Sequence, residues 1–124
     1  MSRSIPLLWG LSISLFALWL RFARLETYSV SLARLMGDER VHVVAHLLLY
    51  GTLALLARRF IGRRVPVVVG TVLAMGAIQE LAQVVGARTP GWPELFDLAV
   101  DTAAALTVCG LAAGLERLRG GRVG

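Results

Sequence analysis

Four side chains able to bind ions or transfer protons recur at intervals of four residues. Asp38, His42, His46 and Tyr50 have this spacing, which places them on one face of a helix. At 1.5 Å of rise per residue, the stripe extends about 18 Å along the helix. Imidazole, carboxylate and phenol groups aligned in this way can coordinate a cation, hold a polar head group or move a proton.

Two later segments contain the amides and carboxylates that could complete such a site. Glu80 and Gln83 lie near the end of one apolar segment, and Asp97 and Asp101 are one helical turn apart near the start of the next. Arg88 lies between these segments. The predicted site, which could bind a ligand or serve only as a structural polar cluster, consists of His42, His46, Tyr50, Glu80, Gln83, Arg88, Asp97 and Asp101.

The histidine pair has the spacing of a metal site, but the surrounding sequence adds little to that interpretation. His42 and His46 are four residues apart, so their imidazoles could share a zinc ion with Glu80 or an aspartate. Position 43 is valine, so the glutamate base of an HExxH protease is absent. The single cysteine, Cys109, cannot form an intrachain disulfide or a cysteine-based metal site. We predict no bound metal and no cofactor, and a metal-dependent hydrolase or transferase is the weakest alternative.

The elements that must position these residues are apolar helices. Of the 124 residues, 56% are hydrophobic, and the mean hydropathy of +0.70 is too high for an ordinary soluble domain. Four apolar segments of about 17 to 21 residues are each long enough to cross roughly 30 Å of hydrocarbon. We predict an all-α, four-helix transmembrane bundle that forms one integral membrane domain over residues 1–124, with spans at about 5–22, 41–57, 65–85 and 95–115.

The arginines predict the orientation of the bundle. The net charge is +5, and all thirteen cationic residues are arginines grouped between apolar segments, which favours membrane topology over nucleic-acid binding. Eight of them belong to the side that holds both termini and the turn at residues 58–64, and five belong to the other side. The positive-inside rule therefore places both termini in the cytoplasm and the polar residues at the opposite end of the bundle.

The segment between the first two spans predicts a short amphipathic helix. Within residues 23–40 the apolar side chains recur at helical spacing, and they are Leu25, Tyr28, Leu32, Leu35 and Met36. Arg24, Glu26 and Arg34 lie off this stripe. We expect this helix to lie on the outer membrane surface.

The order of the polar motifs resembles the VanZ-like family, small integral membrane proteins named for an accessory protein of teicoplanin resistance. The resemblance covers about residues 38–114. It consists of Ala45-His46 with Tyr50 and Leu53 on one helix, Glu80-x-x-Gln83 on the next, then Arg88, and finally Asp97-x-x-x-Asp101-Thr102. A second alignment, with His42 as the family histidine and Asp38 before it, is also open.

The resemblance implies a protein of the bacterial cytoplasmic membrane that belongs to the cell envelope and has a link to antibiotic resistance. It supplies no catalytic residue, so we expect a non-enzymatic protein. Its outward-facing polar pocket would bind a lipid head group, a cell-wall precursor or a lipophilic glycopeptide, with membrane lipid as a partner and no nucleic acid. The alternative is an accessory subunit of a larger membrane complex, or a homo-oligomer, in which the polar cluster is purely structural.

Overall fold

Every regular element that the structure describes is a helix. The computed structural model describes residues 2–22, 30–84 and 92–120. Within these ranges the elements are α1 (Ser4–Phe22), α2 (Val30–Gly37), α3 (Glu39–Phe60), α4 (Val65–Val84) and α5 (Trp92–Gly120). The predicted all-α class is therefore confirmed for the part of the chain that is described.

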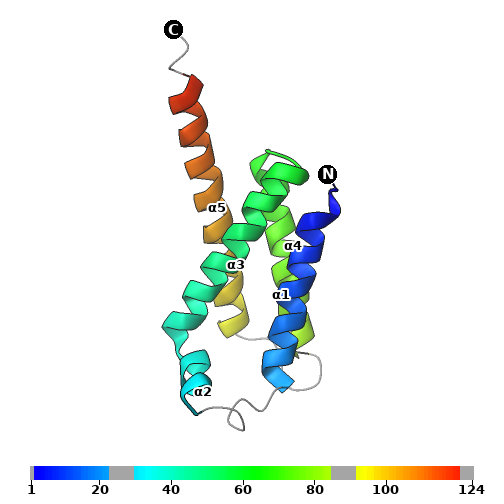
Figure 1. The fold of residues 1–124 in the computed structure, drawn as a ribbon, viewed down its shortest axis with the longest axis vertical. Helices are drawn as coiled ribbons and strands as arrows, with labels where there is room; N and C mark the ends of the chain where they lie inside the picture. The colour runs from blue at the N-terminus through cyan, green and yellow to red at the C-terminus, as the bar shows by residue number, and fades with distance from the viewer. Residues whose placement is uncertain (1, 23–29, 85–91, 121–124) are drawn as a thin grey trace.

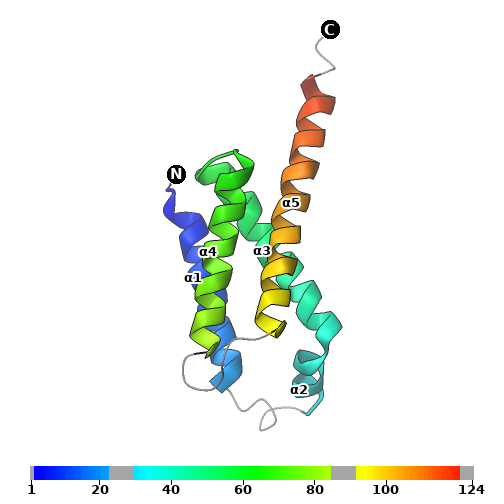
Figure 2. The same cartoon turned by 180° about the vertical axis from the view of Figure 1, so that it is seen from behind.

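The four long helices lie side by side and alternate in direction along the chain (Figure 1). The start of α1, the turn between α3 and α4 and the end of α5 lie at one end of the molecule, here called the turn end (Figure 1). Helix α2 and the starts of α3 and α5 lie at the other, here called the α2 end. Helix α3 slants across the bundle, so its start lies apart from α1 and α4 (Figure 2).

Three helices are long and apolar enough to cross a membrane. They are Glu39–Phe60, Val65–Ala82 and Leu95–Gly120, and they contain the spans predicted at 41–57, most of 65–85, and 95–115. The first apolar helix is shorter over Ser4–Trp19, the part of α1 whose side chains are described. Three of the four predicted spans are thus helices that could cross a membrane.

The start of α3 is fixed by a side-chain cap. Asp38 has extended backbone angles, and its carboxylate accepts a hydrogen bond from the Arg40 amide at 2.8 Å. Such a cap satisfies one of the amide groups that a helix leaves unpaired at its start. The first residue of the polar stripe therefore sets where the helix begins, and thereby the height of His42 and His46 above that end.

The core of the bundle is built from small and branched side chains. Its buried apolar members are Ile13, Tyr50, Leu53, Ala54, Ala57, Val68, Val72, Met75, Ala104, Ala105 and Cys109. The alanines of α3 and α5 allow these two helices to approach closely, as small residues do in membrane proteins. On α1, a side chain at Gly10 would collide with Met75, so α1 packs tightly on α4.

The outer surface of the bundle is also apolar. Large hydrophobic side chains are exposed on every long helix, and examples are Leu8, Leu15, Leu48, Leu81 and Leu111. A water-soluble monomer rarely exposes so continuous an apolar surface. The distribution fits helices whose outer faces contact lipid chains, with His46, Gln79, Glu80 and Asp101 buried inside the bundle.

Candidate functional site

Helices α3 and α5 face each other through two histidine–aspartate pairs. His42 Nε2 lies 3.1 Å from Asp97 Oδ2, and His46 Nδ1 lies 2.8 Å from Asp101 Oδ1. On each helix the two residues are four apart, so the two pairs are stacked about one helical turn apart. The structure thereby brings together four of the predicted site residues. We call His42–Asp97 the outer pair and His46–Asp101 the inner pair.

The two pairs differ sharply in exposure. The side chains of the inner pair are 6% exposed for His46 and 0% for Asp101. In the outer pair the His42 side chain is 46% exposed and that of Asp97 is 13% exposed. The inner pair is therefore sealed within the bundle, whereas His42 of the outer pair lies at its surface.

The polar stripe of α3 continues inward from the inner pair to α4. The ring centroids of His42 and His46 are 4.6 Å apart, and the rings of His46 and Tyr50 are stacked at 5.5 Å. The Tyr50 hydroxyl, which is buried, donates a hydrogen bond to Gln79 Oε1 at 2.6 Å. The stripe thus joins α3 to α5 through the two pairs and to α4 through Tyr50.

Two residues of α4 support this network and were not among the predicted site residues. Gln79 accepts the Tyr50 hydrogen bond. Gly76 lies against Asp101, because a Cβ atom there would stand only 2.8 Å from Asp101 Oδ2. A glycine within a helix weakens the helix by about 1 kcal/mol relative to alanine. The presence of Gly76 inside an apolar helix, despite this cost, was the sequence feature that could have indicated a close helix contact.

The remaining predicted residues are placed as follows. Glu80 is buried on α4. Gln83 belongs to the last turn of α4, but its side chain lies outside the described residues, as does the whole of Arg88. Their predicted places in the site therefore stay predictions.

Asp101 has an unusual environment for a carboxylate. Its Oδ1 atom bonds His46, while Oδ2 is buried and has no hydrogen-bond partner among the described residues. Burying a charged group in an apolar interior costs several kcal/mol unless partners compensate. Asp101 therefore depends on His46 for its only specific polar contact in the described chain.

A further polar contact joins the same two helices at the turn end. Arg58 donates to Glu116 Oε1 at 2.8 Å and to the Arg63 carbonyl at 2.9 Å. The Glu116 side chain is half exposed. This contact joins the end of α3 to α5, and its carboxylate is exposed, unlike that of Asp101.

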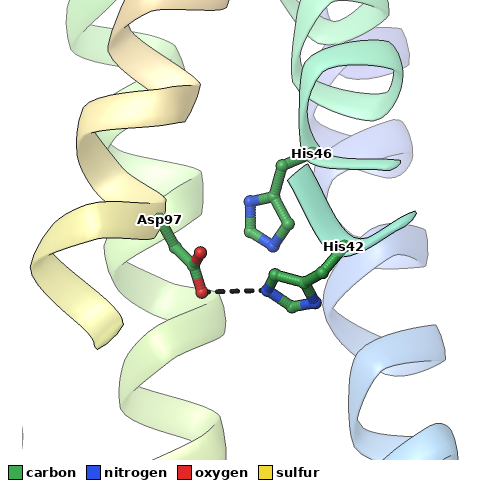
Figure 3. Close-up of side chains that lie close together, drawn as sticks. All are labelled: His42, His46 and Asp97. Atoms are coloured by element: carbon green, nitrogen blue, oxygen red, sulfur yellow. Dashed lines mark hydrogen bonds and ion pairs between the residues drawn. The ribbon is translucent and has the colours of Figure 1, made fainter. Parts of the chain in front are cut away.

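Three of the predicted residues also form a group of metal-ligating type. His42, His46 and Asp97 each offer one ligand atom, and these atoms all lie within 4.8 Å of one another. Figure 3 shows both imidazoles and the Asp97 carboxylate turned toward a common point between α3 and α5. Two imidazole nitrogens and one carboxylate oxygen can hold a cation or hydrogen-bond a polar head group.

Comparisons with protein-family models, curated proteins and solved structures found no match. The VanZ-like resemblance of the motifs stays a prediction, and the geometry described above is the basis for a function.

Proposed function

We propose that the chain is an integral protein of the bacterial cytoplasmic membrane with four spans, formed by α1, α3, α4 and α5. Three of these helices have the length and composition of membrane spans. Helix α1 has 19 residues, which correspond to about 28 Å and approach the thickness of the hydrocarbon layer. Trp9 on α1 donates to the Leu49 carbonyl of α3 at 3.1 Å, so α1 is fastened to the other spans.

The turn end is proposed to face the cytoplasm. Arginines are concentrated there, in the last turn of α3, in the turn that follows and in the last turn of α5, and they are Arg58, Arg59, Arg63, Arg64, Arg117 and Arg119. The positive-inside rule assigns such an end to the cytoplasmic side. The α2 end then faces outward, with α2 as the predicted helix on the outer membrane surface.

In this orientation, the outer pair is proposed as the binding site of a VanZ-like, non-enzymatic envelope protein. The ligand would be the polar head of an amphiphile, whether a lipid head group, a cell-wall precursor or a lipophilic glycopeptide. The observation that carries this proposal is the exposure of His42 beside Asp97 at the α2 end. An imidazole can donate to a phosphate or carboxylate, and an aspartate can accept from hydroxyl or ammonium groups.

The inner pair is proposed to support this site. Its members are buried and bonded to each other, so they are unsuited to direct contact with a ligand. The proposed binding site is therefore smaller than the eight-residue site of the sequence prediction. The inner residues hold α3 and α5 at the separation that the outer pair requires.

The chain has only two histidines, which makes proton NMR of the imidazoles a direct test. The purified protein in detergent would be titrated separately with a short-chain phosphatidylglycerol, undecaprenyl phosphate and teicoplanin. At least one probe should shift the His42 resonance, assigned with His42→Ala, more than that of His46. Asp97→Asn should weaken the response, whereas Glu116→Gln, a carboxylate at the turn end, should preserve it. If none of the probes moves the His42 resonance, the proposed site is wrong.

A second candidate function is an accessory subunit of a larger membrane complex. The last turns of α5 favour it, because among the described residues no atom of another helix lies within 4 Å of where a side chain at Gly110 or Gly114 would begin. Leu111, Leu115 and Leu118 are exposed on the same part of the helix. Native mass spectrometry of the complex extracted in mild detergent tests this role: a stoichiometric second protein supports it, and a monomer counts against it.

A further inference from the structure

We propose that His42, His46 and Asp97 form a binding site for one divalent transition-metal ion, with Zn²⁺ as the ion that best suits the ligands. The metal site rests on the proposed function in one respect, since both need the α2 end to be open to water. It differs in that the ion is bound by the protein itself, whether or not an amphiphile is present.

The ligand atoms are already close to the spacing of a tetrahedral site. Zn²⁺ lies about 2.0–2.1 Å from nitrogen and oxygen ligands, so two such ligands stand about 3.3 Å apart in a tetrahedron. His42 Nε2 and Asp97 Oδ2 are 3.1 Å apart without an ion. All three ligand atoms lie within 4.8 Å of one another, so the other separations need to shorten by no more than about 1.5 Å.

The inner pair prepares His46 to be a metal ligand. Because Asp101 lies 2.8 Å from His46 Nδ1, its carboxylate can accept the Nδ1 proton in a hydrogen bond, which leaves the lone pair on Nε2. Figure 3 shows this second ring nitrogen of His46 on the side that faces His42 and Asp97. A carboxylate behind a ligating histidine is the usual outer-shell arrangement of protein zinc sites.

The two aspartates beside the histidines also favour a cation. Metal binding requires neutral imidazoles and ionised carboxylates, so Asp97 and Asp101 would together bring two negative charges into a largely apolar end of the bundle. One Zn²⁺ balances both. The cation also gives the buried Oδ2 atom of Asp101, which has no hydrogen-bond partner among the described residues, a favourable electrostatic neighbour.

The group has three members, so a tetrahedral ion held by it keeps a fourth position for water or for another ligand. Because the His42 side chain is 46% exposed, that position can be open to a molecule from outside the bundle. A phosphate or carboxylate oxygen of a head group is a suitable fourth ligand. The ion would thus add affinity for anionic head groups to the site proposed above.

The test uses metal alone as the probe. The full-length protein, purified in detergent with chelator and then freed of it, would be titrated with Co²⁺ and then with Zn²⁺. We expect one Co²⁺ per chain, with the intense visible absorption of tetrahedral cobalt, and displacement of cobalt by Zn²⁺. His42→Ala and Asp97→Asn should each lower the affinity at least about 10-fold, while Glu116→Gln should leave it unchanged.

Asp101→Asn provides a further test, because it alters the group behind His46 and removes no ligand. It should weaken the binding of Co²⁺ by about 10- to 100-fold. Circular dichroism would show that each variant keeps its helices. Absence of stoichiometric metal in the wild-type protein, or equal binding by all the variants, would overturn the proposal.

The metal titration and the NMR titration can fail separately. If an amphiphile shifts the His42 resonance of the metal-free protein but the protein binds no Co²⁺, the metal site is wrong and the proposed function stands. If Co²⁺ binds as expected but no amphiphile shifts the His42 resonance of the metal-free protein, the metal site stands and the direct head-group contact is wrong.

Discussion

The inner and outer pairs consist of the same two residue types on the same two helices, yet they have different environments. His46 and Asp101 are buried, while His42, one turn closer to the α2 end, is nearly half exposed. The difference arises from the slant of α3, whose start lies apart from α1 and α4 (Figures 1 and 2). One turn of helix therefore separates a buried histidine from one at the surface of the bundle.

The comparison separates stability from binding within a single motif. A buried pair is costly to break, because removing one partner leaves the other buried and uncompensated. An exposed pair contributes little to stability, since water replaces either partner. Substitutions in the inner pair should therefore change the folding free energy, and substitutions in the outer pair should change binding.

The largest effect is expected from His46→Ala. This substitution leaves Asp101 buried without its hydrogen-bond partner and should lower the free energy of unfolding by about 3–5 kcal/mol. Reversible unfolding in mixed micelles, followed by circular dichroism, measures this loss. Adding Asp101→Ala should restore part of the stability, because no buried carboxylate then remains. If His46→Ala alone is as stable as the wild type, the inner pair does not stabilise the fold and the two pairs do not differ in this respect.

A smaller loss is expected when α4 is pushed away from the inner pair. Gly76→Ala places a methyl group 2.8 Å from Asp101 Oδ2 and 3.1 Å from Leu98 Cδ2, and such overpacking typically costs about 1–3 kcal/mol. Gly70→Ala on the same helix is the matched control, since no atom of another helix in the described part of the chain lies within 4 Å of the new methyl group. The control should be neutral or stabilising by up to about 1 kcal/mol. Equal effects at both positions would show that α4 does not constrain Asp101.

Tyr50→Phe should lower the free energy of unfolding by less than His46→Ala but by more than a substitution in the outer pair. It removes the hydrogen bond to Gln79 and leaves the buried Gln79 oxygen without this donor, at a cost of about 1–2 kcal/mol. Thr52→Val, two residues further along, removes a hydroxyl whose hydrogen bond among the described residues goes to the Leu48 carbonyl of its own helix. The difference between the two unfolding free energies measures the contribution of the contact with α4, and no difference would mean that this contact is not stabilising.

Much of this arrangement could be predicted from the sequence. The four-residue spacings on residues 38–50 and 97–101 define one face of each helix, and the alternating direction of the helices brings those faces to the same end. Apolar segment lengths were enough to indicate the helices that carry them. These two properties predicted that the polar residues reach the same end of the bundle, and the pairing of each histidine of α3 with an aspartate of α5 comes from the structure.

The different burial of the two pairs could not be predicted, because helical periodicity places His42 and His46 on the same helix face and does not distinguish their exposure. Their burial depends on the angle at which α3 crosses α4 and α5, and that angle is set by contacts far apart in the chain. Gln79 was passed over for the same reason, since its sequence neighbours Glu80 and Gln83 have equal claims until the rotation of α4 is known. The contact of Gly76 with Asp101 could not be predicted from the sequence either, because the role of this glycine is to have no Cβ atom where α4 approaches Asp101.

The smallest effect, and the most discriminating one, is expected for the outer pair. A double-mutant cycle with His42→Ala and Asp97→Asn in metal-free protein should give a coupling energy of about 0.2–1 kcal/mol, as for other exposed pairs. Saturating Zn²⁺ should stabilise the wild-type protein, because an ion that binds only the folded state shifts the unfolding equilibrium. Both single variants and the double variant should lose most of this stabilisation. A metal-free coupling energy as large as the His46→Ala loss would instead mean that the outer pair is also a structural contact, and that exposure does not separate the two roles.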